Sequence, residues 1–195
     1  MQRRTFLWGT PGSILAIGLG VSGCTTTGTF DASGHKTDKR HTIDAGVDST
    51  LARLYTTAKG SRELVGKARG VLVFPSVIAA GIFVGGQYGE GSLRVAGSTV
   101  GYYSTTTGSI GLQIGAQSKA IIFLFMTDDA LGRFRNSEGR SVGGDASVAV
   151  LKVGANGNVD TSTATAPIEA FVLTNNGLMA GVTLEGTKIT RLKSL

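Results

Sequence analysis

The sequence predicts an α+β fold, with N-terminal helices packed on a glycine-rich, mainly antiparallel β-sheet or barrel-like core. Glycine makes up 30 of the 195 residues, about twice the usual share of roughly 7%. A helical bundle would not accommodate so many glycines, because each costs about 1 kcal/mol in a helix interior. Only 3 residues are proline and 41% are hydrophobic, which is the composition of a folded domain and not of a disordered chain.

Helical spacing of apolar residues is confined to the segment before residue 70. Apolar side chains recur on one helical face from Ile43 to Ala58, and we expect Thr42 to be the N-cap of this helix. A second short helix is predicted over residues 62–68, where Gly70 would end it. Two helices are therefore expected to precede the sheet.

After Gly70 the chain changes to short apolar runs that alternate with glycines. We expect strands at residues 71–74, 81–86, 92–95, 99–103, 110–114, 121–126 and 147–153. The turn sequence of residues 175–177, Asn-Asn-Gly, separates two further apolar runs and predicts a hairpin. Short strands joined by tight turns favour antiparallel pairing.

One short helix is expected within the strand-rich part. Thr127 is followed by Asp128 and Asp129, the pattern of an N-cap and an acidic first turn, and the helix would end near Arg135. Adjacent carboxylates on a helix point about 100° apart. We therefore assign the two aspartates to helix capping and not to acid–base catalysis.

The N-terminus has the anatomy of an export signal. A basic pair at positions 3 and 4 precedes an apolar stretch from Ile14 to Val21, and small residues lead to Cys24. The apolar stretch is too short to cross about 30 Å of hydrocarbon, so we expect a cleaved signal peptide. The segment that ends at Cys24 resembles a bacterial lipobox, whose cysteine carries the lipid. The basic pair fits either a twin-arginine or a general secretory signal.

These features divide the chain into three parts. We expect a signal peptide with its lipobox over residues 1–23, an acylated Cys24 with a flexible tether over residues 24–41, and a folded domain over residues 42–195. The tether is polar and lacks hydrophobic periodicity. Because Thr25 follows the cysteine where an inner-membrane lipoprotein usually has Asp, the expected location is the outer membrane, facing the periplasm of a bacterial cell envelope.

Basic residues are concentrated around the two predicted helices. Lys59, Arg62, Lys67 and Arg69 lie on or beside one helical edge, and fewer acids than bases occupy residues 36–70. An anionic membrane surface needs several such cations together, because each contributes only about 1 kcal/mol. We predict that these four residues bind anionic phospholipid. The alternative is a solvated helix face without a ligand.

Few residues could support catalysis or bind a metal or cofactor. The two histidines, His35 and His41, lie in or beside the tether, and Cys24 is the single cysteine. No metal-ligand spacing results. The glycine-rich residues 85–91 lack a P-loop signature, and Glu90 would repel a phosphate. We expect no enzyme activity, no metal, no cofactor and no nucleic-acid partner.

Several ordered motifs resemble one known family. Residues 68–77, ARGVLVFPSV, and residues 80–91, AGIFVGGQYGEG, look like the opening signature of the SYLF domain. Residues 111–115, 144–148 and 176–186 are similar to its middle and closing motifs, in the same order. The resemblance covers roughly residues 42–192. Where family members commonly have a Trp-Ser pair, this chain has Tyr102-Tyr103-Ser104.

The resemblance implies a lipid-binding module. Eukaryotic SYLF relatives bind phosphoinositides, some bind actin, and bacterial relatives are often exported or lipid-anchored. The basic N-terminal helical region of the family is thought to contact lipid, which is the stretch that holds the four basic residues above. We expect Phe83, Tyr102 and Tyr103 in the core, and the alternatives are a membrane interface or a pocket for a lipid acyl chain.

The combined prediction is a membrane-anchored, non-enzymatic lipoprotein whose basic helical edge binds anionic phospholipid head groups. The alternative is an envelope protein–protein interaction module in which lipid serves only as the anchor.

Overall fold

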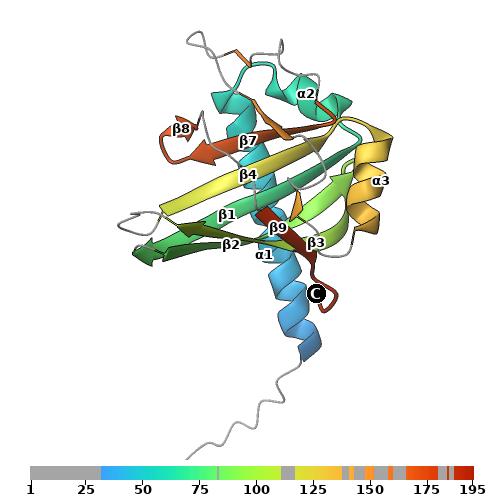
Figure 1. Cartoon of the computed structure of the whole chain (residues 1–195). Coiled ribbons are helices and arrows are strands. Elements are labelled where there is room, and N and C mark those ends of the chain that lie inside the picture. The colour runs from blue at the N-terminus through green and yellow to red at the C-terminus, as the bar shows by residue number, and fades with distance from the viewer. Residues whose placement is uncertain are drawn as a thin grey trace, which may run out of the picture. The chain divides into compact units, whose positions relative to one another are not determined.

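In the described part of the chain, two helices precede a nine-stranded sheet, and a third helix follows its fourth strand (Figure 1). The structure is a computed structural model that describes residues 32–82, 84–110, 117–137, 141–142, 148–151, 158–159, 166–179, 184 and 187–195. The elements are α1 (Ala32–Thr57), α2 (Ser61–Lys67), β1 (Gly70–Ile82), β2 (Val84–Val95), β3 (Ser98–Ile110), β4 (Gln117–Phe125), α3 (Asp128–Asn136), β5 (Ser141–Val142), β6 (Val148–Val150), β7 (Ile168–Thr174), β8 (Gly177–Leu178) and β9 (Thr187–Arg191).

The strand order is β5-β9-β3-β2-β1-β4-β7-β6, and β8 pairs with β7. Among these strands, only the β6–β7 pair is parallel.

The predicted α+β class with a mainly antiparallel sheet is confirmed, as is the hairpin predicted at residues 175–177. The strand predicted over residues 81–86 is wrong as a single element, because β1 ends at Ile82 and β2 begins at Val84, with the two residues paired. Glycines lie on both sides of residue 83, at Gly81, Gly85 and Gly86, and they favour this reversal. The strand predicted at residues 110–114 lies outside the described residues after Ile110.

Both faces of the central strands are buried. On one face, α1 side chains including Val47 and Leu54 pack with Ile122 of β4 and Phe171 of β7. On the other face, Phe123 of β4 belongs to a second cluster that includes side chains of α3. Burial on both faces explains why residues 121–126 are continuously apolar instead of alternating.

Pro75 lies in the interior of β1, a strand with neighbours on both sides. The register shifts between Val73 and Ser76 on the β2 side and between Phe74 and Val77 on the β4 side, so the proline occupies a bulge. Proline has no N–H to donate to a ladder, and a bulge is where a sheet accommodates it. α1 passes close to this point: a Cβ on Gly46 would lie 3.1 Å from Pro75 Cβ.

α1 begins earlier than predicted. The helix starts at Ala32, and Thr42, the predicted N-cap, lies inside it and donates through Oγ1 to the Asp38 carbonyl at 2.9 Å. Residues 34–42 are exposed, so they carry no apolar periodicity that could have indicated a helix. Extending a helix already packed from Ile43 onward needs no new nucleus. Within the described residues, no helix combines the length and apolar character needed to cross a membrane.

The predicted short helix is confirmed as α3. Thr127 Oγ1 accepts a hydrogen bond from Ala130 N at 3.2 Å, which makes Thr127 the N-cap.

We expect Thr127→Ala to lower the free energy of unfolding by about 1 kcal/mol, since one orphan helix N–H loses its acceptor. Urea denaturation would measure the change. Thr56→Ala, which removes only an exposed hydroxyl bonded within α1, is the control, and equal losses in both variants would contradict the capping role.

Candidate functional site

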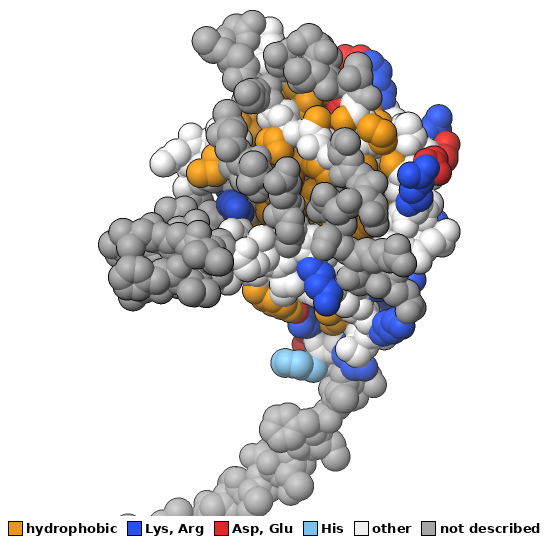
Figure 2. Space-filling model, viewed as in Figure 1, with side chains coloured by type: hydrophobic (Ala, Val, Ile, Leu, Met, Phe, Trp, Pro, Cys, Tyr) orange, Lys and Arg blue, Asp and Glu red, His pale blue; other side chains and the backbone are white. Residues whose placement is uncertain are grey.

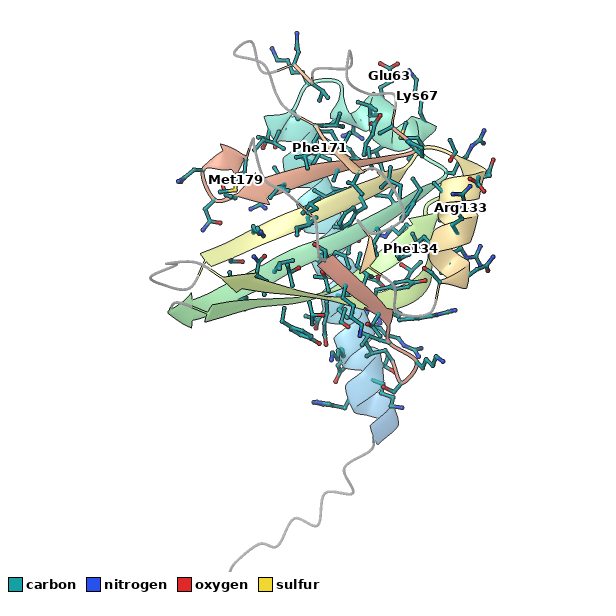
Figure 3. The ribbon with its side chains drawn as sticks, viewed as in Figure 1. Glu63, Lys67, Arg133, Phe134, Phe171 and Met179 are labelled. Atoms are coloured by element: carbon teal, nitrogen blue, oxygen red, sulfur yellow. The ribbon has the colours of Figure 1, made fainter. Side chains whose placement is uncertain are left out.

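The four basic residues predicted to bind lipid lie on or beside α2, and the structure gives three of them other contacts. Lys67 forms an ion pair with Glu63 at 2.7 Å on the same helix (Figure 3). Arg69 pairs with Asp128 of α3 at 3.5 Å. The guanidinium of Arg62 lies 4.2 Å from the centre of the Tyr55 ring. Such exposed contacts are weak, but the two carboxylates halve the local charge of this edge.

Lys59 lies between α1 and α2 and is exposed. Its carbonyl oxygen accepts a hydrogen bond from Val159 N at 3.1 Å. All four predicted residues are exposed, and two of them, Lys67 and Arg69, pair with the carboxylates of Glu63 and Asp128. The pairing of Glu63 with Lys67 could be predicted from their spacing on one helix. The pairing of Asp128 with Arg69 could not, because α3 is remote from α2 in the sequence.

A second group of basic residues lines a pocket of about 880 Å³ beside the β3–β9 pair. α1, β3, α3 and β9 each contribute to it, together with the residues after β9. We call it the cationic pocket. It is lined by Arg40, Thr99, Val100, Gly101, Tyr102, Tyr103, Arg135, Ser137, Lys188, Thr190, Arg191, Leu192, Lys193 and Leu195. Figure 2 shows Lys and Arg side chains gathered on the lower right of this face, on the side of the C-terminus marked in Figure 1.

Among the described residues, the charged side chains that line the cationic pocket are all basic. None of the described residues that line it is Asp or Glu. The ion pairs found among the described residues do not include Arg40, Arg135, Lys188 or Arg191. Several cations around one cavity produce a strong local positive potential, which favours an anionic ligand.

Two tyrosines form the wall of the cationic pocket. Tyr103 is buried and packs on Phe134 of α3 at 5.1 Å between ring centres, and it stands opposite Arg191 in the β3–β9 register. Burial raises the pKa of Tyr103, while the nearby Arg191 and Arg135 guanidinium groups oppose that rise. Tyr102 is half-buried beneath Arg40, whose guanidinium carbon lies 5.8 Å from the ring centre. Of the alternatives for these aromatics, Tyr103 belongs to the core; Phe83 lies outside the described residues.

Gly101 lets the polar groups of this wall approach one another. A Cβ at this position would lie 3.2 Å from Tyr103 Cε2 and 3.6 Å from Arg191 Nε. The absence of a side chain keeps the Arg191 head beside the tyrosine ring and open to the cavity. A larger residue here would occupy the pocket.

Two carboxylates of α1, Asp44 and Asp48, hold side chains of β2 and β3, including Tyr102 and Thr99 of the pocket wall. We call these two residues and their partners the Asp44 cluster. The Asp44 carboxylate accepts hydrogen bonds from Tyr102 Oη at 2.7 Å, Ser92 Oγ at 3.0 Å and Thr99 Oγ1 at 3.0 Å. One turn later, Asp48 accepts from Arg94, and this hydrogen bond lowers the pKa of Asp48. Burial, and then the bond to Asp44, raise the pKa of Tyr102 to about 12, so its hydroxyl remains a donor at neutral pH.

Sequence reasoning missed the cationic pocket and the Asp44 cluster. Arg40 falls in the segment predicted as tether, and Arg135, Lys188 and Arg191 are scattered over more than fifty positions. Asp44 and Asp48 do carry a signal, because carboxylates four residues apart share one helical side. The structure shows what they face, which is side chains of β2 and β3.

Comparison with known families bears on the C-terminal part of the chain. Residues 106–195 match the family model Ysc84, described as Las17-binding protein actin regulator. No curated protein matches the chain. The family match confirms the resemblance predicted from the sequence motifs, and it supports the general class of lipid-binding module that the resemblance implies. The matched residues include Arg135, Lys188 and Arg191 of the cationic pocket.

Proposed function

We propose that this chain, whose residues 106–195 match the Ysc84 (SYLF) family, is a membrane-anchored, non-enzymatic module that binds the phosphate of anionic phospholipid head groups in its cationic pocket. The observation that carries the proposal is the convergence of Arg40, Arg135, Lys188 and Arg191 on one cavity that no Asp or Glu side chain lines among the described residues. Arginine presents a planar set of donors that matches phosphate oxygens.

The pocket combines charge with apolar surface. Val100 and Leu192 line it beside the cations, so a ligand with a charged head and an apolar glycerol or acyl portion could use both. Arg62 and Lys59 on the α2 edge would add weaker, less localised attraction to the same anionic surface. The pocket therefore supplies head-group binding, and the predicted edge supplies general attraction.

Anchoring through an acylated Cys24 would increase the importance of even a weak pocket. A domain tethered to the bilayer meets lipid head groups at a high effective concentration. We propose the outer membrane, on its periplasmic side, as the location, because Thr25 follows the cysteine. The envelope would then provide both the anchor and the ligand.

The test compares two double variants that change the net charge by the same amount. Arg135→Glu with Arg191→Glu reverses the pocket, and Arg62→Glu with Arg69→Glu reverses the predicted edge; all four side chains are exposed. Residues 25–195, which contain the whole compact unit Ala32–Leu195, would be sedimented with phosphatidylcholine vesicles with and without phosphatidylglycerol, at low and physiological salt.

We expect salt-sensitive binding to the phosphatidylglycerol vesicles. The pocket variant should lose at least about tenfold in affinity, because it removes two of the arginines that surround the bound head group and puts carboxylates in their place. The edge variant should lose about threefold or less. A larger loss of affinity in the edge variant than in the pocket variant would indicate that lipid binds at Lys59, Arg62, Lys67 and Arg69. Equal losses would indicate that the pocket contributes only through the overall positive charge of the protein.

The family description favours one second candidate, an envelope protein-interaction module that uses the same pocket surface. Its ligand would be an acidic segment of a protein, and lipid would serve only as the anchor. This candidate predicts a folded protein that ignores all vesicles but binds a protein from a lipid-free envelope extract. The pocket variant should then fail to bind that protein, whereas the edge variant should still bind it.

A further inference from the structure

We infer that docking of the first part of α1 is coupled to occupancy of the cationic pocket by an anion, and that Asp44 is the positioning residue that couples them. The inference rests on the proposed function, because it describes how that binding site is completed. It assigns α1 a part in ligand binding that goes beyond covering the sheet.

The first part of α1 is held almost entirely by polar contacts. Residues 34–42 are exposed, and the next residue, Ile43, is buried. Lys39 reaches Glu90 of β2 at 2.8 Å, and Arg40 lies over the Tyr102 ring. A helical segment without buried apolar side chains opens at low free energy. Undocking of this part is therefore a local opening that costs little free energy.

Docking brings an additional cation into a cavity that already holds several. Arg40 arrives from α1, whereas Arg135, Lys188 and Arg191 belong to α3 and β9. Like charges around one cavity repel each other, so an empty pocket opposes docking. An anion between them converts that repulsion into attraction and favours the docked helix.

Asp44 connects the helix to the wall of the pocket. Its carboxylate holds the hydroxyls of Tyr102, Thr99 and Ser92, and the first two of these residues also line the cavity. The main-chain oxygen of Asp44 accepts from Arg94 at 3.3 Å. The Tyr102 ring on which Arg40 rests therefore keeps its position only while Asp44 is in place. Binding linkage is reciprocal, so an anion that prefers the docked helix must stabilise docking by the same factor.

Asp44→Asn separates positioning from simple electrostatics. The substitution removes a negative charge close to the pocket, so charge alone predicts tighter binding of an anion. A positioning role predicts the opposite, because an amide cannot accept from three hydroxyls with the strength of a carboxylate. We expect Asp44→Asn to weaken binding about five- to tenfold.

The matched control is Asp38→Asn, which makes the same charge change on the exposed side of the same helix. It should bind as tightly as the parent or slightly more tightly. Ser92→Ala is a milder second variant, since it removes one donor to Asp44 at a buried position that does not line the cavity. It should shift affinity in the same direction as Asp44→Asn, by about two- to threefold.

The measurements are the affinity of residues 25–195 for soluble dihexanoyl phosphatidylglycerol and hydrogen exchange of the amides of residues 34–43. Dihexanoyl phosphatidylcholine and inorganic phosphate are the comparison ligands, which distinguish a lipid head group from free phosphate. Saturating phosphatidylglycerol lipid should slow exchange in residues 34–43 at least threefold in the parent. It should slow exchange much less in Asp44→Asn, a ligand-dependent difference that a merely structural role would not produce.

The outcomes separate this inference from the proposed function. If the parent binds the anionic lipid but exchange in residues 34–43 is unchanged, or if Asp44→Asn binds as tightly as Asp38→Asn, the coupling is wrong and the pocket remains a lipid site. If the parent binds none of the anionic ligands, both proposals fall. Protection of residues 34–43 together with weaker binding by Asp44→Asn would establish the coupling.

Discussion

Gly91→Ala is expected to lower the free energy of unfolding by about 3 kcal/mol or more, a loss large enough to unfold a marginally stable domain. A Cβ on Gly91 would lie 2.0 Å from the Val73 carbonyl oxygen and 2.8 Å from Phe74 Cδ1. The first of these atoms is backbone at the edge of the Pro75 bulge, and both residues are fully buried. Neither atom can move away without disturbing the centre of the sheet.

The matched control for this prediction is Gly86→Ala on the same strand. A Cβ at Gly86 would meet no atom within 4 Å among the described residues, and neither glycine has a positive φ. Gly86→Ala should therefore change stability little, or raise it slightly through the unfolded state. Guanidinium denaturation of both variants would measure the difference in the free energy of unfolding. Equal stabilities would contradict the prediction, because they would mean that the backbone at the bulge shifts to accept a Cβ at little cost.

Gly91 also matters to the proposed site. Its neighbours in β2 are Glu90, which pairs with Lys39, and Ser92, which donates to Asp44. A shift of this strand would move the contacts that hold the first part of α1. Gly91→Ala protein that still folds should therefore bind anionic lipid less tightly, whereas Gly86→Ala protein should not.

Much of the fold could be predicted because local signals agree with tertiary structure there. Thr127 caps α3 as its sequence indicates, since an N-cap is decided by residues three positions apart. The Asn-Asn-Gly turn closes the β7–β8 hairpin, where Gly177 has a φ of 116°. The beginning of α1 could not be predicted, because Lys39 and Arg40 are held by Glu90 and Tyr102, which are remote in the sequence.

The sequence predicts a basic surface for lipid on α2, but it does not indicate the cationic pocket. A basic, glycine-rich domain preceded by a segment that resembles a lipobox favours an anionic lipid ligand, and the family match supports a lipid-binding module. The four predicted lipid-binding residues lie on or beside one helix, where periodicity can be counted. Arg40, Arg135 and Arg191 meet only because β9 pairs with β3 and both α1 and α3 pack beside that pair. Long-range strand pairing leaves no local signal of this kind.

Glu169→Gln is expected to raise the free energy of unfolding at pH 7 by about 1–3 kcal/mol. Glu169 lies in β7, opposite Leu124 of β4 and Ala149 of β6, and its relative exposure is 0%. Neither carboxylate oxygen has a hydrogen-bond partner among the described residues. Burial raises the pKa of Glu169, because the charged form loses its hydration without gaining a donor.

The effect should depend on pH with a definite sign. Below about pH 4.3, the ordinary pKa of a glutamate, the carboxyl group is protonated in both the unfolded and the folded chain, and its contribution to stability is fully present. As pH rises, the unfolded chain ionises first and the folded state is disfavoured until its own, raised pKa is passed. The parent should therefore match Glu169→Gln at pH 4 and fall progressively below it towards pH 7.

Urea denaturation of the parent and Glu169→Gln at pH 4, 5, 6 and 7 would measure this trend. Glu63→Gln is the control, because Glu63 is exposed and the hydrogen bond from Lys67 lowers its pKa instead of raising it. Glu63→Gln should give no gain in stability at pH 7. A constant difference between the parent and Glu169→Gln from pH 4 to pH 7 would contradict a raised pKa. A gap that widens with pH would show that the sheet carries a buried acid at the expense of stability, as functional residues do more often than core residues.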